Sequence, residues 1–190
     1  ALPEARERLA LLMERFRRII PGLEQAGGGE LELLSNIPRG QGFGSSAALC
    51  AAVASALCSA LGRKDALAGV WAYAHEAERL FHGTPSGIDT GLALLNGLYL
   101  FHPDPPNLPA ARRLAGRELP LVLGAVSRRA ETGELIRKLR EGMAAGGRRT
   151  ARLLGELGEI ARRAAEVLEG GPGGPEGERL ALLGELACQA

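Results

Sequence analysis

The stretch that decides the fold runs from residue 38 to residue 48 and reads Pro-Arg-Gly-Gln-Gly-Phe-Gly-Ser-Ser-Ala-Ala. Its three glycines, Gly40, Gly42 and Gly44, permit positive φ angles and let the backbone approach a ligand closely. From Ser45 onward the residues SSAALCAAVASALCSAL predict a long apolar helix that should be buried. The first turn of this helix would offer N–H groups and a positive dipole end to an anion. The stretch therefore predicts a loop that wraps the phosphates of a nucleotide.

Two other interpretations of this loop stay open from the residues alone. An ordinary junction between a strand and a helix would also place glycines here. The hydroxyls of Ser45 and Ser46 could cap the helix or bind Mg²⁺. The loop is not of the Walker A type, because no lysine follows Gly44.

A second motif extends from Glu78 to Asp89 and reads Glu-Arg-Leu-Phe-His-Gly-Thr-Pro-Ser-Gly-Ile-Asp. Pro85 and Gly87 predict a tight turn that fixes Asp89 at the end of a loop. A carboxylate there could accept the proton of a hydroxyl that attacks a γ-phosphoryl group. Glu78, on the preceding helix, would offer a hard oxygen ligand to Mg²⁺. Taken singly, Glu78 could be a solvated helix residue, and Asp89 could be a helix cap.

Working outward, the pattern of apolar residues predicts a mixed α+β fold. We expect helices over 3–20, from 45 onward, from a cap at Asp65 through Phe81, and over 131–142, 149–169 and 176–189. We expect strands over 30–37, 91–101 and 119–126, and loops over 103–109 and 170–175. The stretch 91–101 could be one strand or two strands with a turn at Asn96-Gly97.

Composition bounds the class of protein. The 190 residues suit one domain, or one domain with a lobe, and the net charge of +1 argues against a dedicated nucleic-acid or polybasic membrane surface. Cys50 and Cys58 lie eight residues apart on one expected helix, about 12 Å by helical rise, which is too far for a disulfide. Reduced, buried thiols in a cytoplasmic protein are therefore expected.

The whole loop string resembles the phosphate loop of the GHMP kinases, a superfamily that includes galactokinases, homoserine kinases, mevalonate kinases and phosphomevalonate kinases. In that loop a proline precedes Gly-Leu-Gly-Ser-Ser-Ala-Ala, and Phe43 here stands where leucine is usual. The resemblance implies a two-layer α/β sandwich, with an N-terminal part like ribosomal protein S5 domain 2 and a helical, ferredoxin-like C-terminal part. It implies that ATP is held by Pro38, Gly40, Gln41, Gly42, Phe43, Gly44, Ser45, Ser46 and Ala47.

The string His-Gly-Thr-Pro-Ser-Gly-Ile-Asp at 82–89 resembles the signature of the mevalonate kinase family, and residues 71–79 resemble the helix before it. That family continues with asparagine where this chain has Thr90. Galactokinases carry a different string, and homoserine kinases lack the aspartate. The resemblance implies that Asp89 is catalytic, that Ser46 and Glu78 bind Mg²⁺, and that mevalonate is the substrate. It also offers four candidate substrate contacts: His82, Gly83, Thr84 and Thr132.

Residues 127–136 look like the segment that follows a central strand in that family. Thr132 matches the family pattern, whereas its arginine and serine positions do not align cleanly. Arg128 or Arg129 could meet a phosphate or a substrate carboxylate, and a solvated helix start would explain them equally well.

The resemblance divides the chain at residue 126, into an ATP-binding and catalytic part over 1–126 and a partial, mainly helical C-terminal domain over 127–190. Two pieces of the family are not matched: an N-terminal strand segment with a lysine, and a C-terminal glycine-rich strand-loop. We therefore expect a GHMP-like fold that is incomplete at both ends. The alternatives are another GHMP substrate, such as phosphomevalonate or a sugar, and an inert nucleotide-binding fragment; a homodimer is also open.

Overall fold

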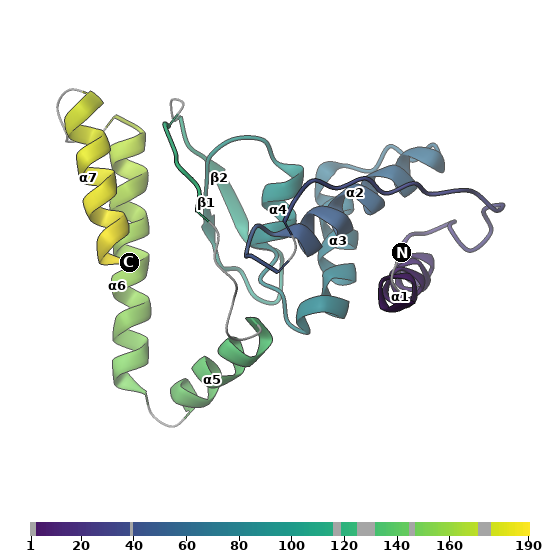
Figure 1. Ribbon diagram of the computed structural model, residues 1–190, viewed down its shortest axis with the longest axis horizontal. Helices are drawn as coiled ribbons and strands as arrows, with labels where there is room; N and C mark the ends of the chain where they lie inside the picture. The colour runs from purple at the N-terminus through teal and green to yellow at the C-terminus, as the bar shows by residue number, and fades with distance from the viewer. Residues whose placement is uncertain (1–2, 39, 116–118, 125–131, 145–146, 171–175) are drawn as a thin grey trace. The chain divides into compact units, whose positions relative to one another are not determined.

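The computed structural model describes residues 3–38, 40–115, 119–124, 132–144, 147–170 and 176–190 (Figure 1). The chain forms two compact units. The first is built mainly from the residues up to Asn96 together with Pro103–Pro109. The second contains Gly97–His102, Ala110–Gly124 and the C-terminal helices.

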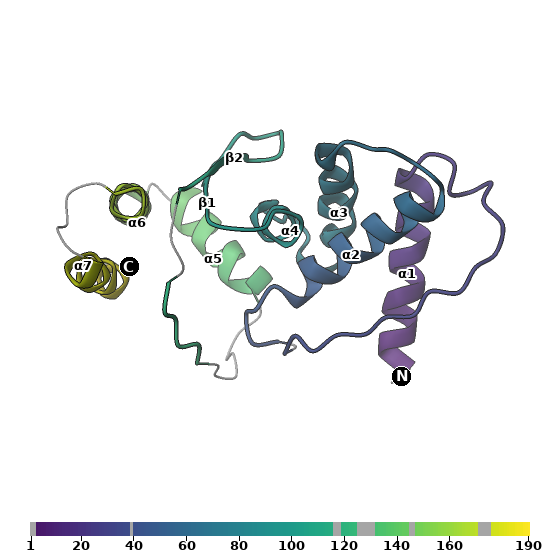
Figure 2. The same ribbon diagram turned by 90° about the horizontal axis from the view of Figure 1, so that it is seen from above.

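Four helices make up the first unit: α1 (Pro3–Ile19), α2 (Ser45–Ala60), α3 (Leu67–His82) and α4 (Ile88–Leu94). Helix α2 packs against α3 and α4, and α1 packs against α3 (Figure 2). The predicted helices over 3–20, from 45 onward and through Phe81 are confirmed to within one or two residues.

The core of this unit joins large side chains on α1 to small ones on α2 and α3. Its members are Leu12, Phe16, Ile20, Cys50, Ala51, Val53, Ala54, Cys58, Ala74 and Ala77. Six of the ten are alanine or cysteine, and four of these six lie on α2, so that helix can approach its neighbours closely. This close approach brings the start of α2 next to the end of α3. Cys50 and Cys58 are both buried and free, as expected.

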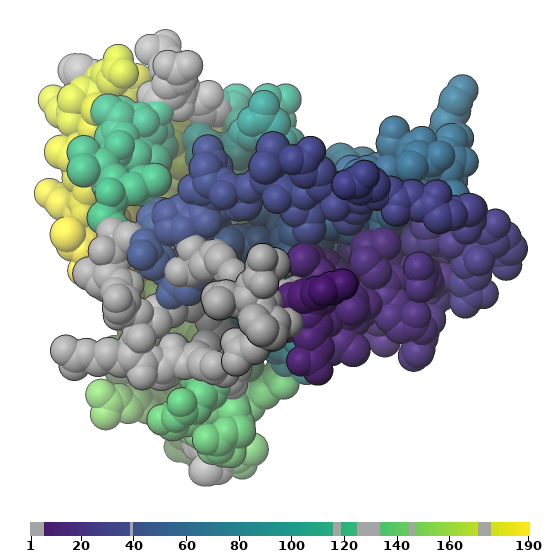
Figure 3. Space-filling model, turned by 45° about the vertical axis from the view of Figure 1, so that its right-hand side comes forward, coloured from purple at the N-terminus to yellow at the C-terminus, as the bar shows by residue number. Residues whose placement is uncertain are grey.

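The predicted strand over 30–37 is wrong. These residues form neither helix nor strand, and Leu34 is 88% exposed. Within the described residues the only sheet is the two-stranded β1–β2 pair, so residues 30–37 have no neighbouring strand to complete a ladder. Figure 3 shows this stretch, in dark blue, lying at the surface.

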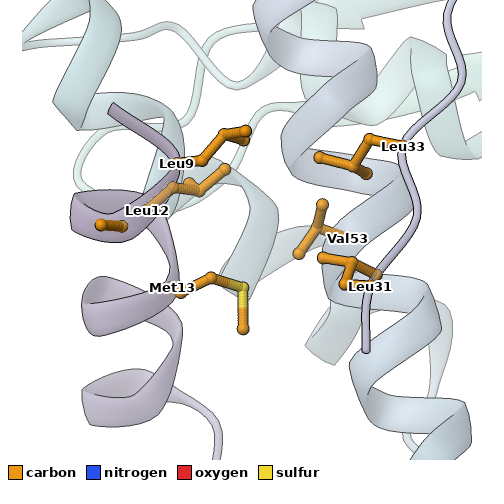
Figure 4. Close-up of a pocket in the computed structure, with 7 residues that line it drawn as sticks. Leu9, Leu12, Met13, Leu31, Leu33 and Val53 are labelled. Carbon is orange, nitrogen blue, oxygen red and sulfur yellow. The ribbon is translucent and has the colours of Figure 1, made fainter. Parts of the chain in front are cut away.

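Two leucines of the same stretch nevertheless face the helices. Leu31 and Leu33 line an apolar cavity of about 200 Å³ together with Leu9, Ala10, Leu12, Met13 and Val53 (Figure 4). Every lining residue is apolar, so the cavity offers no side-chain partner for a phosphate or a metal ion. It is therefore a packing feature between α1, α2 and this stretch.

Asp65 does not cap α3, contrary to the prediction. The N-cap residue is Ala66, without a side-chain hydrogen bond. The Asp65 carboxylate instead accepts two hydrogen bonds from Arg63, of 2.6 and 2.7 Å. A bidentate pair of this kind uses both carboxylate oxygens, which explains why none reaches the helix start.

The predicted strand over 91–101 is wrong in its first half. Residues 88–94 form the short helix α4, and β1 (Tyr99–His102) begins only after a turn near Asn96-Gly97.

The predicted strand over 119–126 is also wrong where it is described: residues 119–124 are irregular, and Val122 is fully exposed. Residues 125 and 126 lie outside the described residues.

The second unit contains the sheet and three helices: α5 (Thr132–Ala144), α6 (Arg148–Leu168) and α7 (Glu176–Gln189). The strand β1 pairs antiparallel with β2 (Ala110–Arg113), which the sequence did not predict. Helices α6 and α7 pack side by side, and Arg112 of β2 forms an ion pair with Glu169 after α6. The three predicted C-terminal helices are confirmed; most of the predicted loop over 170–175 lies outside the described residues.

The chain is thus α+β, mostly helical with one small sheet among the described residues. In that part of the chain no helix is long and apolar enough to cross a bilayer. The predicted division at residue 126 stays a prediction.

We predict that Phe16→Ala lowers the free energy of unfolding by about 3–5 kcal/mol, because Phe16 is fully buried and its removal leaves a cavity. Leu11→Ala on the same helix is the matched control, since Leu11 is 54% exposed and should cost less than about 1 kcal/mol. Urea denaturation measures both values. Equal losses in the two variants would contradict the described packing of α1.

Candidate active site

The glycine loop has the backbone that the sequence predicted. Gly40, Gly42 and Gly44 adopt φ angles of 71°, 86° and 66°, a region that favours glycine. A Cβ atom built on Gly40 or Gly44 would meet nothing within 4 Å. These two glycines are therefore required by backbone conformation and leave open space beside the loop.

The start of α2 is open to a ligand. Gly44 is the N-cap residue and makes no side-chain capping hydrogen bond, so the helix-capping role considered for Ser45 and Ser46 is wrong at this N-cap. The first N–H groups of an α-helix have no partner within the helix. Residues 40–43 are exposed, Phe43 at 37%, and Gly44, Ser45 and Ser46 are half-buried. The amides needed to bind an anion are thus within reach of solvent.

Ser46 connects the loop to the second motif. Its Oγ shares a hydrogen bond of 2.9 Å with Nε2 of His82, the last residue of α3. The same imidazole nitrogen lies 4.0 Å from Oε1 of Glu78, one helical turn earlier. The hydroxyl of Ser46 and the carboxylate of Glu78 therefore converge on one point, although 32 residues separate them.

Glu78 is the buried acid of this group. It is 2% exposed, so the solvated-face interpretation of this residue is wrong. Burial, and after it the negative charge of Asp89, raises the pKa of the Glu78 carboxyl from 4.5 to about 7. A carboxyl in such a place gains stability from a proton or from a cation.

Asp89 lies in the first turn of α4 and is exposed. The N-cap of α4 is Gly87, at φ 82°, so Asp89 does not cap the helix as the alternative interpretation proposed. Helix α4 begins at Ile88, which means that Asp89 stands just inside a helix and not at the end of a loop. Its charge is close enough to raise the pKa of Glu78.

The structure thus brings Ser46, Glu78, His82 and Asp89 together from three helices. Gly83 and Thr84 lie exposed in the turn that follows His82. Of the remaining predicted residues, Pro38 and Gln41 are exposed in the loop, and Ala47 is buried in the first turn of α2. Thr132 begins α5 in the second unit, and Arg128 and Arg129 lie outside the described residues.

Sequence reasoning missed the thiol beside this group. Cys50 follows Ser46 by one helical turn, and burial together with the charge of Glu78 raises its pKa to about 12. The spacing of four residues was a usable signal, since residues four apart lie on one helix face. At that pKa the thiol stays protonated, so Cys50 is a neutral member of the core behind this group and not a nucleophile.

The donor set fits a magnesium ion that is shared with a nucleotide. Among the described residues no three His, Cys, Asp or Glu side chains form a metal-binding group. Magnesium in kinases is bound instead by one or two protein oxygens, several waters and the substrate phosphates. The hydroxyl of Ser46 and the carboxylate of Glu78 are hard oxygen donors beside a loop that suits phosphates.

Comparison with protein families gives the class. Residues 7–97 match the model of the GHMP kinases N terminal domain. This range contains the glycine loop and all four converging side chains. Residues 7–97 are therefore a GHMP kinase N-terminal domain.

Within that class, several similar proteins of known identity are mevalonate kinases. The chain is 29% identical over 166 residues to the mevalonate kinase of Thermococcus sibiricus, covering 87% of this chain and 48% of that protein. It is 30% identical over 157 residues to that of Pyrococcus horikoshii, covering 83% and 45%. Against the mevalonate kinase of Homo sapiens it is 28% identical over 178 residues, covering 80% and 43%.

The chain spans about half the length of these relatives. No solved structure matches it.

We predict that the metal-free protein becomes less stable between pH 4.5 and about 7, through Glu78. Its folded-state pKa is raised to about 7 from 4.5, so the folded chain holds this proton more tightly than the unfolded chain. Raising the pH through this window therefore removes stability, by about 3 kcal/mol for this group.

Other groups titrate too, so the comparison is with Glu78→Gln, which cannot ionise. Denaturation at several pH values should show a steeper loss in the wild type than in Glu78→Gln. Glu141→Gln, at an exposed ion pair on α5, should follow the wild type. Parallel profiles for wild type and Glu78→Gln would refute the raised pKa.

Proposed function

We propose that the protein is an ATP-dependent kinase that phosphorylates the 5-hydroxyl of mevalonate to give 5-phosphomevalonate. The observation that carries the proposal is the convergence of Ser46 and Glu78 on His82 beside the open start of α2. A phosphate loop, a metal-ligand pair and a nearby carboxylate are the parts that phosphoryl transfer needs. The similar mevalonate kinases support mevalonate as the substrate.

In this proposal the loop 40–47 binds the triphosphate through its amides and through the positive end of the α2 dipole. Ser46 and Glu78 bind Mg²⁺, which neutralises charge on the phosphates. A bound metal ion would stabilise the ionised Glu78 carboxylate and so offset the effect of burial and of Asp89, which favour the protonated form. We also propose the larger two-layer GHMP sandwich as the setting of these residues in the whole protein.

Asp89 acts on the acceptor. The hydroxyl oxygen of mevalonate forms a bond to the γ-phosphorus, and the bond from that phosphorus to the β,γ-bridging oxygen breaks. The hydroxyl proton passes to the carboxylate of Asp89, and the leaving group is ADP. His82, Gly83, Thr84 and Thr132 remain candidate contacts to the substrate.

We predict that Asp89→Asn lowers kcat by about 10²–10⁴-fold, because the amide cannot accept the proton. The measurement is ADP release in a coupled assay with mevalonate, Mg²⁺ and ATP. Asp104→Asn is the matched control, since Asp104 is exposed and pairs only locally with Asn107 among the described residues. Full activity in Asp89→Asn would disprove its role.

The same assay separates the alternatives. Turnover of phosphomevalonate or a sugar in place of mevalonate would assign another substrate within the GHMP class. Thermal stabilisation by ATP without turnover of any acceptor would identify an inert nucleotide-binding protein.

We predict that Ser46→Ala weakens binding of a non-hydrolysable ATP analogue about tenfold in the presence of Mg²⁺ and much less in EDTA. The loss of one ligand oxygen removes metal-dependent affinity, whereas the loop amides remain. Ser55→Ala on the same helix is the control, because Ser55 donates its hydroxyl to the carbonyl of Ala51, away from the loop. Isothermal titration calorimetry gives the affinities. An equal loss with and without Mg²⁺ would rule out a metal-ligand role.

A further inference from the structure

One backbone carbonyl next to the candidate site accepts hydrogen bonds from three donors. The carbonyl oxygen of Gly87 lies 2.9 Å from Nε1 of Trp71 and 3.1 Å from Oγ1 of Thr90. The backbone N–H of Gly91 donates to the same oxygen at 2.9 Å, as the first bond of α4. A carbonyl normally serves one or two donors, so this one is held more firmly than most. We call this arrangement the Gly87 anchor.

The side chains of the anchor are closely packed. Thr90 is fully buried, and Trp71 is 8% exposed. A Cβ atom built on Gly91 would lie 2.2 Å from Cζ2 of Trp71, closer than atoms can approach. The indole ring therefore lies directly against the backbone of α4, and only glycine fits at position 91.

Gly87 is also confined on its other side. A Cβ atom there would lie 3.0 Å from Cδ of Pro109 and 3.2 Å from Cδ2 of Leu108. It would also lie 3.4 Å from Nδ1 of His75, on the face of α3 that carries Trp71. Gly87 has a φ of 82°. Residues of α3 and of the segment 108–109 thus fix the position of its backbone and the direction of its carbonyl group.

Asp89 depends on this anchor for its position. Asp89 is exposed, and in the sequence it lies between Gly87 and Thr90, two residues of the anchor. Helix α4 has seven residues, too few to be stable without tertiary contacts. The direction of the Asp89 carboxylate therefore follows from where the anchor holds the first turn of α4.

We propose that Trp71 and Thr90 are positioning residues for Asp89: their hydrogen bonds to the Gly87 carbonyl hold the carboxylate toward Glu78 and the start of α2. The part of this proposal that concerns catalysis rests on the proposed function of Asp89. Trp71 and Thr90 act through the backbone and do not touch the reacting groups. Misplacement of a catalytic group by about 1 Å can cost about 100-fold in rate, which gives the scale of the effect.

Three variants test the anchor. Thr90→Val keeps the shape of the side chain and removes the donor, Thr90→Ser keeps the donor, and Trp71→Phe keeps an aromatic ring without the N–H group. Leu92→Ala is the control, because Leu92 lies on the same helix and is 46% exposed. Urea denaturation first establishes which variants are folded.

The first readout needs no turnover. Amide hydrogen exchange of residues 84–91 should become about tenfold faster in Thr90→Val and in Trp71→Phe, and stay within about twofold of wild type in Thr90→Ser and Leu92→Ala. Unchanged exchange in both Thr90→Val and Trp71→Phe would overturn the anchor, whatever the kinetics show.

The second readout separates positioning from folding. In the kinase assay, Thr90→Val and Trp71→Phe should lower kcat by about 10- to 100-fold while KM for MgATP changes less than about twofold. Thr90→Ser should restore kcat. Equal losses of kcat in Thr90→Val and Thr90→Ser would overturn the role of the hydroxyl. If the wild type is inactive but amide exchange is still faster in Thr90→Val and Trp71→Phe, the anchor is supported and the catalytic role of Asp89 is refuted.

Discussion

The constraint on which the site depends is the burial of the Glu78 carboxyl beside a second acid. Taking one carboxylate out of water is costly, and the negative charge of Asp89 adds to the cost, so the pKa of Glu78 rises to about 7. A proton or a nearby cation therefore stabilises the buried Glu78 carboxyl. The open start of α2 lies next to the same group through Ser46. In the proposed function, a metal-bound polyphosphate would therefore supply the positive charge to Glu78 and an anion to the start of α2.

The packing of the helices in the first unit brings Ser46, Glu78 and Asp89 close to one another. Alanines on the facing sides of α2 and α3, such as Ala54 and Ala77, let the two helices pack closely. The start of α2 consequently meets the end of α3, where Glu78 and His82 share one helix face. Helix α4 is then held against α3 by Trp71, which gives the exposed Asp89 a fixed place. In the proposed function, each of the three helices would contribute one part of the site: the phosphate-binding start of α2, the metal ligand Glu78 on α3, and Asp89 on α4.

Features of the fold and the site that depend on residues close in the sequence could be predicted, whereas features that depend on residues far apart could not. The loop 40–44 and the helix after it were predictable, because positive φ angles and apolar periodicity are local properties. The strand over 30–37 was predicted from alternation and the strand over 119–126 from a short apolar run, but a strand needs a partner that neither pattern can supply. Helix α4 was mistaken for a strand because the contact that favours it, the Trp71 ring against Gly91, joins residues 20 apart. The resemblance supplied Ser46, Glu78 and Asp89 as site residues, whereas the hydrogen bond of His82 to Ser46 and the burial of Glu78 required coordinates.

We propose that the loop 40–47 and the acidic motif 78–89 form one site for a metal–nucleotide complex. Paramagnetic relaxation by Mn²⁺, bound together with a non-hydrolysable ATP analogue, measures the position of the metal directly against assigned backbone amide signals. We expect the strongest broadening at amides 44–47, 78–82 and 88–90. Broadening centred on the apolar cavity beside Met13, or on the C-terminal helices with the loop unaffected, would contradict this proposal.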